Sequence, residues 1–386
     1  MKKKISILGS TGSIGLSTLK IIDKNKNLFK INFLSADKNL RLISKQIIKY
    51  KPKYFIVKNY EVFNKIKKKF KSYKTIILNN FNYGNLDKSD ITVSAIPGIA
   101  GLEPTISAIK TTKKILIANK ESIICGWNLI KKNSIIYNTK IIPVDSEHYS
   151  ILKLIEQEDL NLIKKIYITA SGGPFLNYKK KRFKKITPKD ALKHPKWKMG
   201  KKISIDSATM MNKILEIAEA EKLFEISNIK LEILIHPESL VHAIVEFKNG
   251  LKKFIYHDTT MVIPIANAIF DKNLDIKKFY KSKEEPQIKN LTFSSVDSKI
   301  FPLIKIKKKI NQYPSSSIIL NAANEILVEH FLSKKVPFLS ISKGIFKILS
   351  DSNFKKYAVR KPTNISNIIK TNDWAKEKIN KILRIN

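Results

Sequence analysis

The sequence predicts an α/β fold in three parts: an N-terminal parallel sheet, a central α+β region and a C-terminal helical region. Over the first 145 residues, short β-type runs alternate with amphipathic helical segments. Such alternation is typical of a parallel sheet with helices on both faces. Strand and helix patterns mix between residues 146 and 270, and helical patterns dominate after residue 299. A chain of 386 residues also exceeds the length that one hydrophobic core usually serves.

Apolar periodicity places the elements of the N-terminal region. Helical spacing of apolar residues predicts helices over Ser13–Ile22, Leu40–Tyr50 and Glu61–Phe70. Strands are expected at short apolar runs that are bounded by polar or turn-forming residues. The six runs are Lys4–Leu8, Ile31–Leu34, Tyr54–Val57, Ile91–Ile96, Ile115–Ile117 and Ile141–Val144.

The same reasoning divides the rest of the chain. Strands are predicted in the central region at Lys165–Thr169, Leu231–Ile235 and Ala243–Phe247. The charged, proline-containing stretch near residues 271–289 is typical of a linker, and helices are expected at Ile318–Phe331 and Ile341–Leu349. The predicted domains are therefore residues 1–145, 146–270 and 299–386, with 271–298 as the linker.

The net charge is strongly positive, +41 from 73 basic and 32 acidic residues. A nucleic-acid-binding protein is nevertheless disfavoured, because only four basic residues are arginine, the side chain best suited to reading base edges. The lysines are spread along the whole chain. Such a charge favours anionic ligands without identifying one.

Neither a membrane nor a disulfide is expected. No apolar run approaches the roughly 18–20 residues that span a bilayer, and glycine and serine at positions 9–13 interrupt the N-terminal apolar stretch. We therefore expect a cytoplasmic protein. Cys125 is the single cysteine, which excludes an internal disulfide and suggests a small buried hydrophobic side chain.

A glycine-rich segment, Gly9-Ser10-Thr11-Gly12-Ser13-Ile14-Gly15, follows the first predicted strand and opens the first helix. In that context glycines let the backbone approach a pyrophosphate, and the helix N-terminus supplies N–H donors and a partial positive charge. A plain tight turn is the alternative. The position at the first strand–helix junction favours a Rossmann-like dinucleotide-binding domain.

Asp37 lies just past the second predicted strand. An acidic residue there usually binds the ribose hydroxyls of NAD and repels a 2′-phosphate. The neighbouring Lys38, Asn39 and Arg41 could bind that phosphate instead. These residues by themselves therefore do not decide between NADH and NADPH as the cofactor.

Carboxylates follow the strand Ile141–Val144. If the backbone stays extended, Asp145 and Glu147 project from one face and suit a hard divalent cation. Capping of the following helix is the alternative. A third carboxylate, Glu216, favours the metal interpretation.

Glu216 shares a predicted helical face with Asn212 and Lys213 through i+3 and i+4 spacing. Ser207 is expected near the start of this helix, where an anion is favoured. A hydroxyl, an amide, an ammonium and a carboxylate together fit a phosphorylated substrate beside a metal. A solvated polar face with an ordinary N-cap is the alternative for the segment taken alone.

Two further segments have the character of ligand loops. Ser171-Gly172-Gly173-Pro174 is either a second phosphate-binding turn or a simple turn. The loop from His194 to Gly200 holds Trp197 between proline and glycine. It is either a lid that excludes water or a loop anchored by its tryptophan.

These segments together resemble the 1-deoxy-D-xylulose 5-phosphate reductoisomerase family. The resemblance runs from residue 4 to about residue 330, and its specificity comes from the number and order of the motifs. The motifs are GSTGSIG, ANKES, PVDSEH, SGGPF, HPKWKMG, KISIDSATMMNK, LIHPESLVH and LNAANE.

The resemblance implies a function. The protein would be an NADPH- and divalent-metal-dependent oxidoreductase that rearranges and reduces 1-deoxy-D-xylulose 5-phosphate to 2-C-methyl-D-erythritol 4-phosphate, in non-mevalonate isoprenoid biosynthesis. It would be a homodimer with a helical C-terminal domain. The metal would be Mg²⁺ or Mn²⁺, with Co²⁺ as a further candidate.

The resemblance also implies a role for each matching residue. The residues expected at NADPH are Thr11, Gly12, Ser13, Ile14, Asp37, Lys38, Asn39, Asn119, Glu121 and Gly200. The expected metal ligands are Asp145, Glu147 and Glu216. The substrate carbon chain would meet Lys120, Ser146 and His194. Its phosphate would meet Ser171, Ser207, Asn212 and Lys213, and Trp197 and Met199 would close over both ligands.

Three positions depart from the family pattern. Asp37 stands where the family usually has glycine, and Pro97 replaces a more usual small or branched residue. His257–Val262 replaces an acidic stretch that resembles Pro-Asp-Met-Arg. None of the three removes an expected catalytic residue.

Two other classes of protein compete with this interpretation. A nicotinamide dehydrogenase without metal accounts for the glycine segment but gives no reason for Asp145, Glu147 and Glu216 to converge. A basic nucleic-acid-binding protein accounts for the charge but predicts clustered arginine and aromatic residues, which the sequence lacks.

Overall fold

The structure, a computed structural model, describes residues 2–81, 87–197, 199–270, 274–281 and 290–384. Lys198 and parts of the predicted linker, residues 271–273 and 282–289, lie outside the described residues. The chain forms two compact units. Unit 1 comprises residues 1–122, 128–149 and 260–283, and unit 2 comprises residues 123–127, 150–259 and 284–386.

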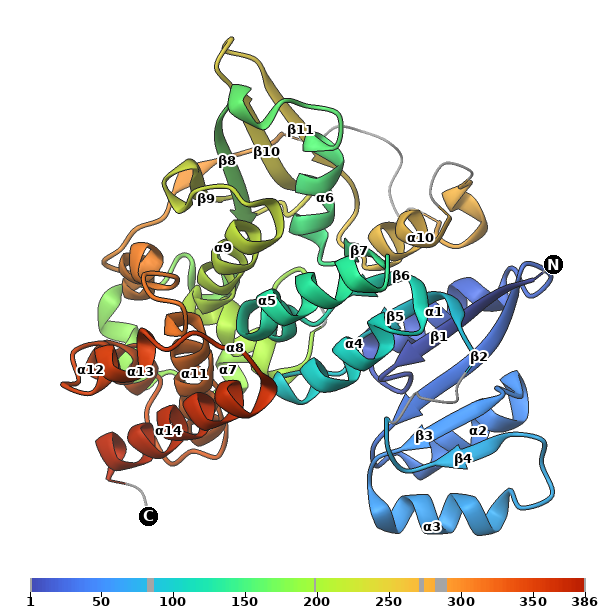
Figure 1. Ribbon diagram of the computed structural model, residues 1–386. Coiled ribbons are helices and arrows are strands. Elements are labelled where there is room, and N and C mark those ends of the chain that lie inside the picture. Colours follow the sequence, from blue (N-terminus) through green and yellow to red (C-terminus); the bar gives the residue numbers. More distant parts are fainter. Residues whose placement is uncertain (1, 82–86, 198, 271–273, 282–289, 385–386) are drawn as a thin grey trace. The chain divides into compact units, whose positions relative to one another are not determined.

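Unit 1 is built on a parallel sheet of seven strands in the order β4-β3-β2-β1-β5-β6-β7 (Figure 1). The predicted strands are present with small differences at their ends, and β4 is an addition of three residues that the sequence analysis missed. The strands are β1 (Lys3–Leu8), β2 (Phe29–Ala36), β3 (Tyr54–Val57), β4 (Ile76–Leu78), β5 (Ser89–Ser94), β6 (Thr112–Ile117) and β7 (Lys140–Pro143).

Helices connect these strands. They are α1 (Ser13–Asp23), α2 (Leu40–Tyr50), α3 (Tyr60–Lys69), α4 (Leu102–Ile109) and α5 (Lys120–Ile136). Asparagine begins several of them, because its short side chain accepts a hydrogen bond from the first helical turn. Asn39 accepts from the backbone N–H of Leu42 at 3.0 Å, and Asn59 accepts from Val62 at 3.0 Å.

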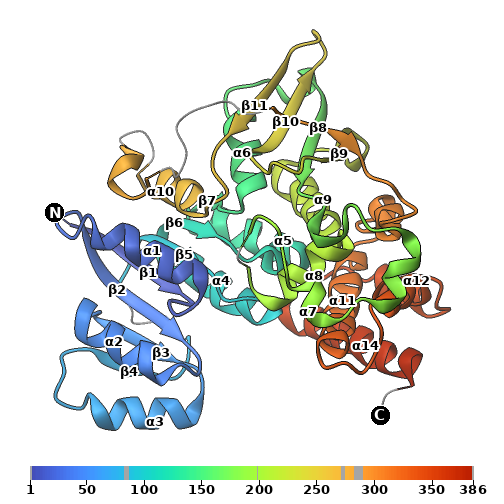
Figure 2. The ribbon, with the colours of Figure 1, turned by 180° about the vertical axis from the view of Figure 1, so that it is seen from behind.

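Helix α10 (Val262–Phe270) also belongs to unit 1, although it follows the central region in the chain. It lies beside α1 (Figure 2). The Lys114 ammonium donates to the backbone carbonyl of Ala268 at 2.9 Å, and the rings of Phe29 and Phe270 meet edge to face at 5.5 Å. The domain boundaries expected from the sequence stay a prediction.

Unit 2 contains a mixed sheet of five strands in the order β11-β10-β8-β9-β12. Strand β8 is parallel to β9 and antiparallel to β10, and β10 forms an antiparallel hairpin with β11. The strands are β8 (Ile163–Ala170), β9 (Leu231–Ile235), β10 (Val241–Phe247), β11 (Lys252–Tyr256) and β12 (Ser294–Ser295). The sequence analysis missed β11, an edge strand with mostly exposed residues, and the short β12.

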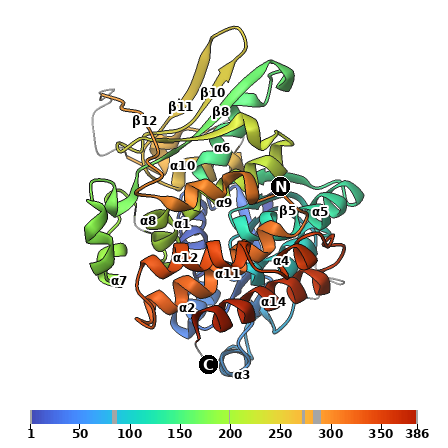
Figure 3. The same ribbon diagram turned by 90° about the vertical axis from the view of Figure 1, so that its left-hand side faces the viewer.

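The helices of unit 2 pack on this sheet and on one another, and Figure 3 shows α11, α12 and α14 side by side. The helices are α7 (Pro188–Ala191), α8 (Lys201–Thr209), α9 (Met211–Phe224), α11 (Ser316–Leu332), α12 (Leu339–Leu349), α13 (Phe354–Ala358) and α14 (Ile365–Leu383). Helix α6 (Ser146–Ile155) begins in unit 1 and ends in unit 2. A single hydrophobic cluster joins strand residues such as Ile168 to Ile214 of α9 and Leu320 of α11. The C-terminal helices therefore share a core with the central sheet.

In the described part of the chain, no helix combines the length and the apolar character needed to cross a bilayer.

Candidate active site

The carboxyl ends of β1, β5, β6 and β7 lie along one edge of the unit 1 sheet, because these strands are parallel neighbours. The chain direction across the sheet reverses at β1, which has β2 on one side and β5 on the other. In open α/β sheets, ligands bind in the crevice at such a switch point. The glycine segment follows β1 and therefore lies at this edge.

The glycine segment has two positions where only glycine fits. Gly9 has φ +80°, and a Cβ there would lie 2.7 Å from the backbone oxygen of Ala95, beyond the end of β5. A Cβ on Gly15 would lie 2.4 Å from the backbone oxygen of Gly9. Both contacts are too short for any side chain, so the turn is held tightly between β1, β5 and α1.

Thr11 to Ile14 form the end of this turn and the start of α1, which begins at Ser13. Gly12 occupies the N-cap position and provides no side-chain hydrogen bond to the helix. The first backbone N–H groups of a helix have no partner within the helix and favour an anion. Their backbone geometry would therefore suit an anion, and the cofactor role of these four residues stays a prediction.

Asp37, Lys38 and Asn39 follow β2 directly, as the sequence predicts. Asp37 and Lys38 are exposed. The Asn39 side-chain oxygen caps α2, so this asparagine already has a structural role at its oxygen atom.

Asn119 fixes two loops at the ends of β5 and β6. Its side-chain oxygen accepts from the Ser122 N–H at 2.8 Å and caps α5, and its amide donates to the carbonyls of Gly98, at 2.9 Å, and Ile96. Sequence reasoning assigned Asn119 only to the cofactor. Its position before an apolar-periodic segment was the signal for a helix cap.

The backbone does not stay extended through Glu147, the condition on which the shared face depended, because β7 ends at Pro143 and α6 begins at Ser146. Asp145 instead accepts from the Glu147 N–H at 3.1 Å, as a helix-capping residue does. The two carboxylates still come together, with oxygen atoms within 4.8 Å of each other. The capping role and the metal role are therefore compatible.

Asp145 is ionised by its surroundings. Its Oδ2 lies 3.3 Å from the Lys120 ammonium, and its Oδ1 lies 3.3 Å from His148 Nδ1. Burial by itself would raise the pKa of the carboxyl, but Lys120 and His148 outweigh this effect and hold the pKa well below its ordinary value. Ser146 donates its hydroxyl to Glu147 Oε2. Asp145 and Glu147 together offer a pair of oxygen donors, which suits a hard divalent cation. Lys120 keeps one of them, Asp145, ionised.

In unit 2, His194 and Ser171 form a second group. The His194 Nδ1 accepts from the N–H groups of Lys196, at 3.2 Å, and Trp197, at 2.9 Å. The proton of the neutral ring therefore belongs on Nε2, which donates to Ser171 Oγ at 3.0 Å. Burial, with a contribution from the nearby Lys213, lowers the pKa of His194 to about 4. The ring is neutral near pH 7.

Ser171 Oγ accepts from the Gly173 N–H at 3.1 Å as well as from His194. Because both acceptor positions of the oxygen are used, the hydroxyl hydrogen points in another direction, where it can donate a hydrogen bond to an anion. Gly172 and Gly173 both have positive φ, and a Cβ on Gly173 would lie 3.1 Å from the backbone oxygen of Ser207. The Ser171 turn is thus packed directly against Ser207.

Ser207 lies in the last turn of α8, so the expectation that it stands near a helix start is wrong. Helix α9 begins four residues later, after Met210, which has φ +64°. The sequence pattern did not predict that one helix ends shortly after Ser207 and another begins, because the apolar spacing continues through this segment.

The predicted proximity of Asn212, Lys213 and Glu216 is observed on α9. The Lys213 ammonium lies 2.7 Å from Glu216 Oε2, and the Asn212 amide donates to Glu216 Oε1. The Glu216 side chain is 1% exposed. A buried carboxylate needs such partners, because an unpaired one would be very costly.

The loop before α8 contains Trp197, Met199 and Gly200, and Gly200 is the N-cap residue of α8. Trp197 packs against His242, with ring centroids 6.1 Å apart. His242 in turn stacks on His257 at 3.9 Å. The sequence analysis singled out His257 only as part of a departure from the family pattern, and it missed this contact.

The fold and these side chains define the class of protein: a Rossmann-like α/β enzyme with carboxylates and a glycine-rich turn at one sheet edge. Family models described as 1-deoxy-D-xylulose 5-phosphate reductoisomerase and its C-terminal domains match residues 5–126, 141–224 and 258–378. The chain belongs to the 1-deoxy-D-xylulose 5-phosphate reductoisomerase family.

Relatives and solved structures agree with this assignment over nearly the whole chain. The 1-deoxy-D-xylulose 5-phosphate reductoisomerase of Pelagibacter ubique is 48% identical over 98% of each chain. The structure of the Zymomonas mobilis enzyme in complex with NADPH superposes with a TM-score of 0.88 at 30% identity, covering 99% of each chain. A reductoisomerase in complex with NADPH, fosmidomycin and magnesium gives 0.89 at 31% identity, covering 99% of this chain and 98% of that one.

Proposed function

We propose that this protein converts 1-deoxy-D-xylulose 5-phosphate to 2-C-methyl-D-erythritol 4-phosphate, using NADPH and a divalent metal. The observation that carries the proposal is the ionised Asp145 beside Glu147 and Lys120 at the sheet edge that also holds the glycine turn. A relative of similar fold binds NADPH, fosmidomycin and magnesium.

NADPH would bind along the sheet edge of unit 1. The backbone of Thr11 to Ile14 supports a pyrophosphate contact, because the first N–H groups of α1 lie there. Lys38 and Asn39, with Asp37, would face the ribose phosphate, and Arg41 would add charge. We assign Asn119, Glu121 and Gly200 to further cofactor contacts.

We assign the metal to Asp145, Glu147 and Glu216. All three are oxygen donors, as Mg²⁺ and Mn²⁺ prefer, and Co²⁺ is a further candidate. When bound, such an ion acts as a Lewis acid on a ketone oxygen and a neighbouring hydroxyl. Lys120 would hold Asp145 ionised and oriented, and Ser146 would orient Glu147 through its hydroxyl contact.

The phosphate would bind to side chains of unit 2. Ser171 offers a hydroxyl hydrogen, Lys213 an ammonium and Asn212 an amide, and Ser207 adjoins the Ser171 turn. The neutral His194 orients Ser171 and, with Lys120 and Ser146, would contact the carbon chain. Binding the remote phosphate supplies free energy that orients the reacting carbons.

Three further assignments complete the proposal. Trp197 and Met199 would cover the ligands and exclude water. The chain would divide into domains at residues 1–145, 146–270 and 299–386, joined by a linker at 271–298. The protein would act as a homodimer in the cytoplasm.

A coupled assay tests the function directly. 1-Deoxy-D-xylulose 5-phosphate is added to the purified protein and NADPH, and the oxidation of NADPH is measured with and without EDTA. We expect oxidation that stops with EDTA and returns with excess Mg²⁺. Activity that is insensitive to EDTA would indicate a metal-free dehydrogenase, and no oxidation at all would contradict the proposal.

A further inference from the structure

The corner between α8 and α9 is strained. Met210, fully inside the protein, joins the two helices with φ +64° and ψ +5°. A residue other than glycine rarely adopts this left-handed conformation, because its Cβ is crowded there. Such a conformation persists only where the surrounding contacts determine it. Ser207 precedes this corner, and Asn212 and Lys213 follow it, so the corner sets the distance between the proposed phosphate ligands.

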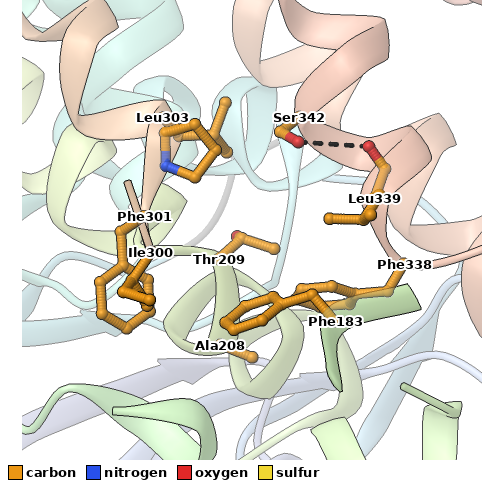
Figure 4. Close-up of a pocket in the computed structure, with 10 residues that line it drawn as sticks. Phe183, Ala208, Thr209, Ile300, Phe301, Leu303, Phe338, Leu339 and Ser342 are labelled. Carbon is orange, nitrogen blue, oxygen red and sulfur yellow. Dashed lines mark hydrogen bonds between the residues drawn. The ribbon is translucent and has the colours of Figure 1, made fainter. Parts of the chain in front are cut away.

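Local contacts hold only part of the corner. The Thr209 hydroxyl bonds to the backbone carbonyls of Ile205, at 3.1 Å, and Asp206, at 3.2 Å, and it accepts from the Met211 N–H at 3.3 Å. Figure 4 shows Ala208 and Thr209 beside a small apolar pocket that Phe183, Leu303 and Phe338 also line. The hydrophobic effect that acts on these side chains is itself non-directional.

A directional contact comes from the C-terminal helices. Asn324 of α11 donates its side-chain amide to Asp206 Oδ1 at 2.7 Å, across 118 positions of sequence. Both side chains are almost completely buried, and Lys202 pairs with Asp206 Oδ2 at 3.0 Å one turn earlier in α8. Asp206 immediately precedes Ser207. A hydrogen bond to a buried charged group is strong, and removing one partner leaves the other uncompensated.

We propose that Asp206 and Asn324 are positioning residues for the phosphate subsite: their hydrogen bond holds Ser207 and the Met210 corner in place. Neither residue is assigned to a ligand. The inference rests on the proposed function only for the identity of the anion, because the contacts themselves lie within unit 2. It makes α11 part of the substrate-binding apparatus as well as of the core.

The test compares charge variants at two buried asparagines of α11. Asn324→Asp places a second carboxylate against Asp206, whereas Asn321→Asp places the same charge one turn away, where Asn321 meets Cys125 instead of α8. Inorganic phosphate binding is measured by calorimetry, and the Michaelis constant for the sugar phosphate and the dissociation constant of NADPH are measured beside it. We expect Asn324→Asp to weaken phosphate binding and raise the Michaelis constant by about tenfold or more. NADPH binding should be unchanged, and Asn321→Asp should lower stability without this effect.

A swapped pair provides the decisive variant. Asp206→Asn combined with Asn324→Asp restores one donor and one acceptor, so phosphate binding should return to within about threefold of the native value. If Asn324→Asp does not fold, the neutral Asn324→Ala is used in its place. Equal loss of phosphate binding in Asn321→Asp, or no recovery in the swapped pair, would overturn the proposal. A native protein that binds phosphate but does not turn over the sugar phosphate would contradict the proposed function alone, while one that binds no phosphate would overturn the positioning role.

Discussion

The ammonium of Lys222 in α9 donates to the backbone carbonyl of Ile124, at the place where α5 bends. The bend is at Gly126, whose φ of −127° and ψ of 18° are not helical. Ser317 of α11 bonds to both partners, at 2.9 Å to Lys222 and 3.1 Å to the Ile124 carbonyl. Lys222 as a whole residue is half-buried, and its ammonium has these two partners inside unit 2. Burial lowers the pKa of this ammonium to about 8, although Cys125 and Glu221 act in the opposite direction.

The Lys222 contact predicts a stability that depends on pH. The folded pKa of about 8 lies below the ordinary value of 10.5, so the unfolded chain binds more protons between these pH values. The stability of the native protein relative to Lys222→Met should therefore rise from pH 8 to pH 10.5, by at most about 3 kcal/mol. Urea unfolding of both proteins across this range measures the difference. The exposed Lys201→Met serves as the control, and a constant difference for Lys222→Met would contradict the assigned pKa.

Glu216→Gln should nearly abolish turnover and leave NADPH binding largely intact. The substitution keeps the shape of the side chain but removes the negative charge that we assign to the metal. Steady-state rates at varied Mg²⁺ and NADPH titration by fluorescence measure the two effects. Glu221→Gln is the matched control, because Glu221 lies on the same helix and bonds to Asn228 and Asn311. Normal turnover of Glu216→Gln at limiting Mg²⁺ would show that the metal ligand is misassigned.

Asp37→Gly should lower the Michaelis constant for NADPH and leave that for NADH unchanged or raised. Two anions about 4 Å apart repel by roughly 1 kcal/mol in water, and by more in a partly desolvated site. Lys38 and Arg41 should offset this repulsion, so the native protein is still expected to prefer NADPH. Kinetics with both cofactors on both proteins test the expectation, with Glu61→Gln as a charge control. If the native protein preferred NADH, the assignment of Asp37 to the binding site of the 2′-phosphate would be wrong.

Gly15→Ala should destabilise the protein by about 1–3 kcal/mol, because overpacking in a fixed environment has this cost. The added Cβ would lie 2.4 Å from the Gly9 backbone oxygen. At Gly12 the same Cβ would meet that oxygen at 3.4 Å, an ordinary contact, so Gly12→Ala should fold normally. Thermal unfolding of both variants is the measurement. Equal stability of the two would mean that the glycine turn adapts.

Local pattern was sufficient for much of unit 1. Buried strands leave apolar runs, and the glycine turn has a fixed place after the first strand, so β1 to β3, β5 to β7 and the turn could all be read from the sequence. Short or exposed edge strands such as β4 and β11 were missed, because their pairing depends on a neighbour and not on their own apolar content.

The sequence by itself determined the fold class, the glycine turn and the residue types of the candidate site. Only the tertiary structure decided the conformation at Asp145, which caps a helix, and at Ser207, which ends one. It alone paired Asp206 with Asn324 and Lys222 with Ile124. The physical reason is that hydrophobic periodicity reports which face of an element is buried, whereas a hydrogen bond between residues far apart in the chain leaves no periodic pattern in either segment.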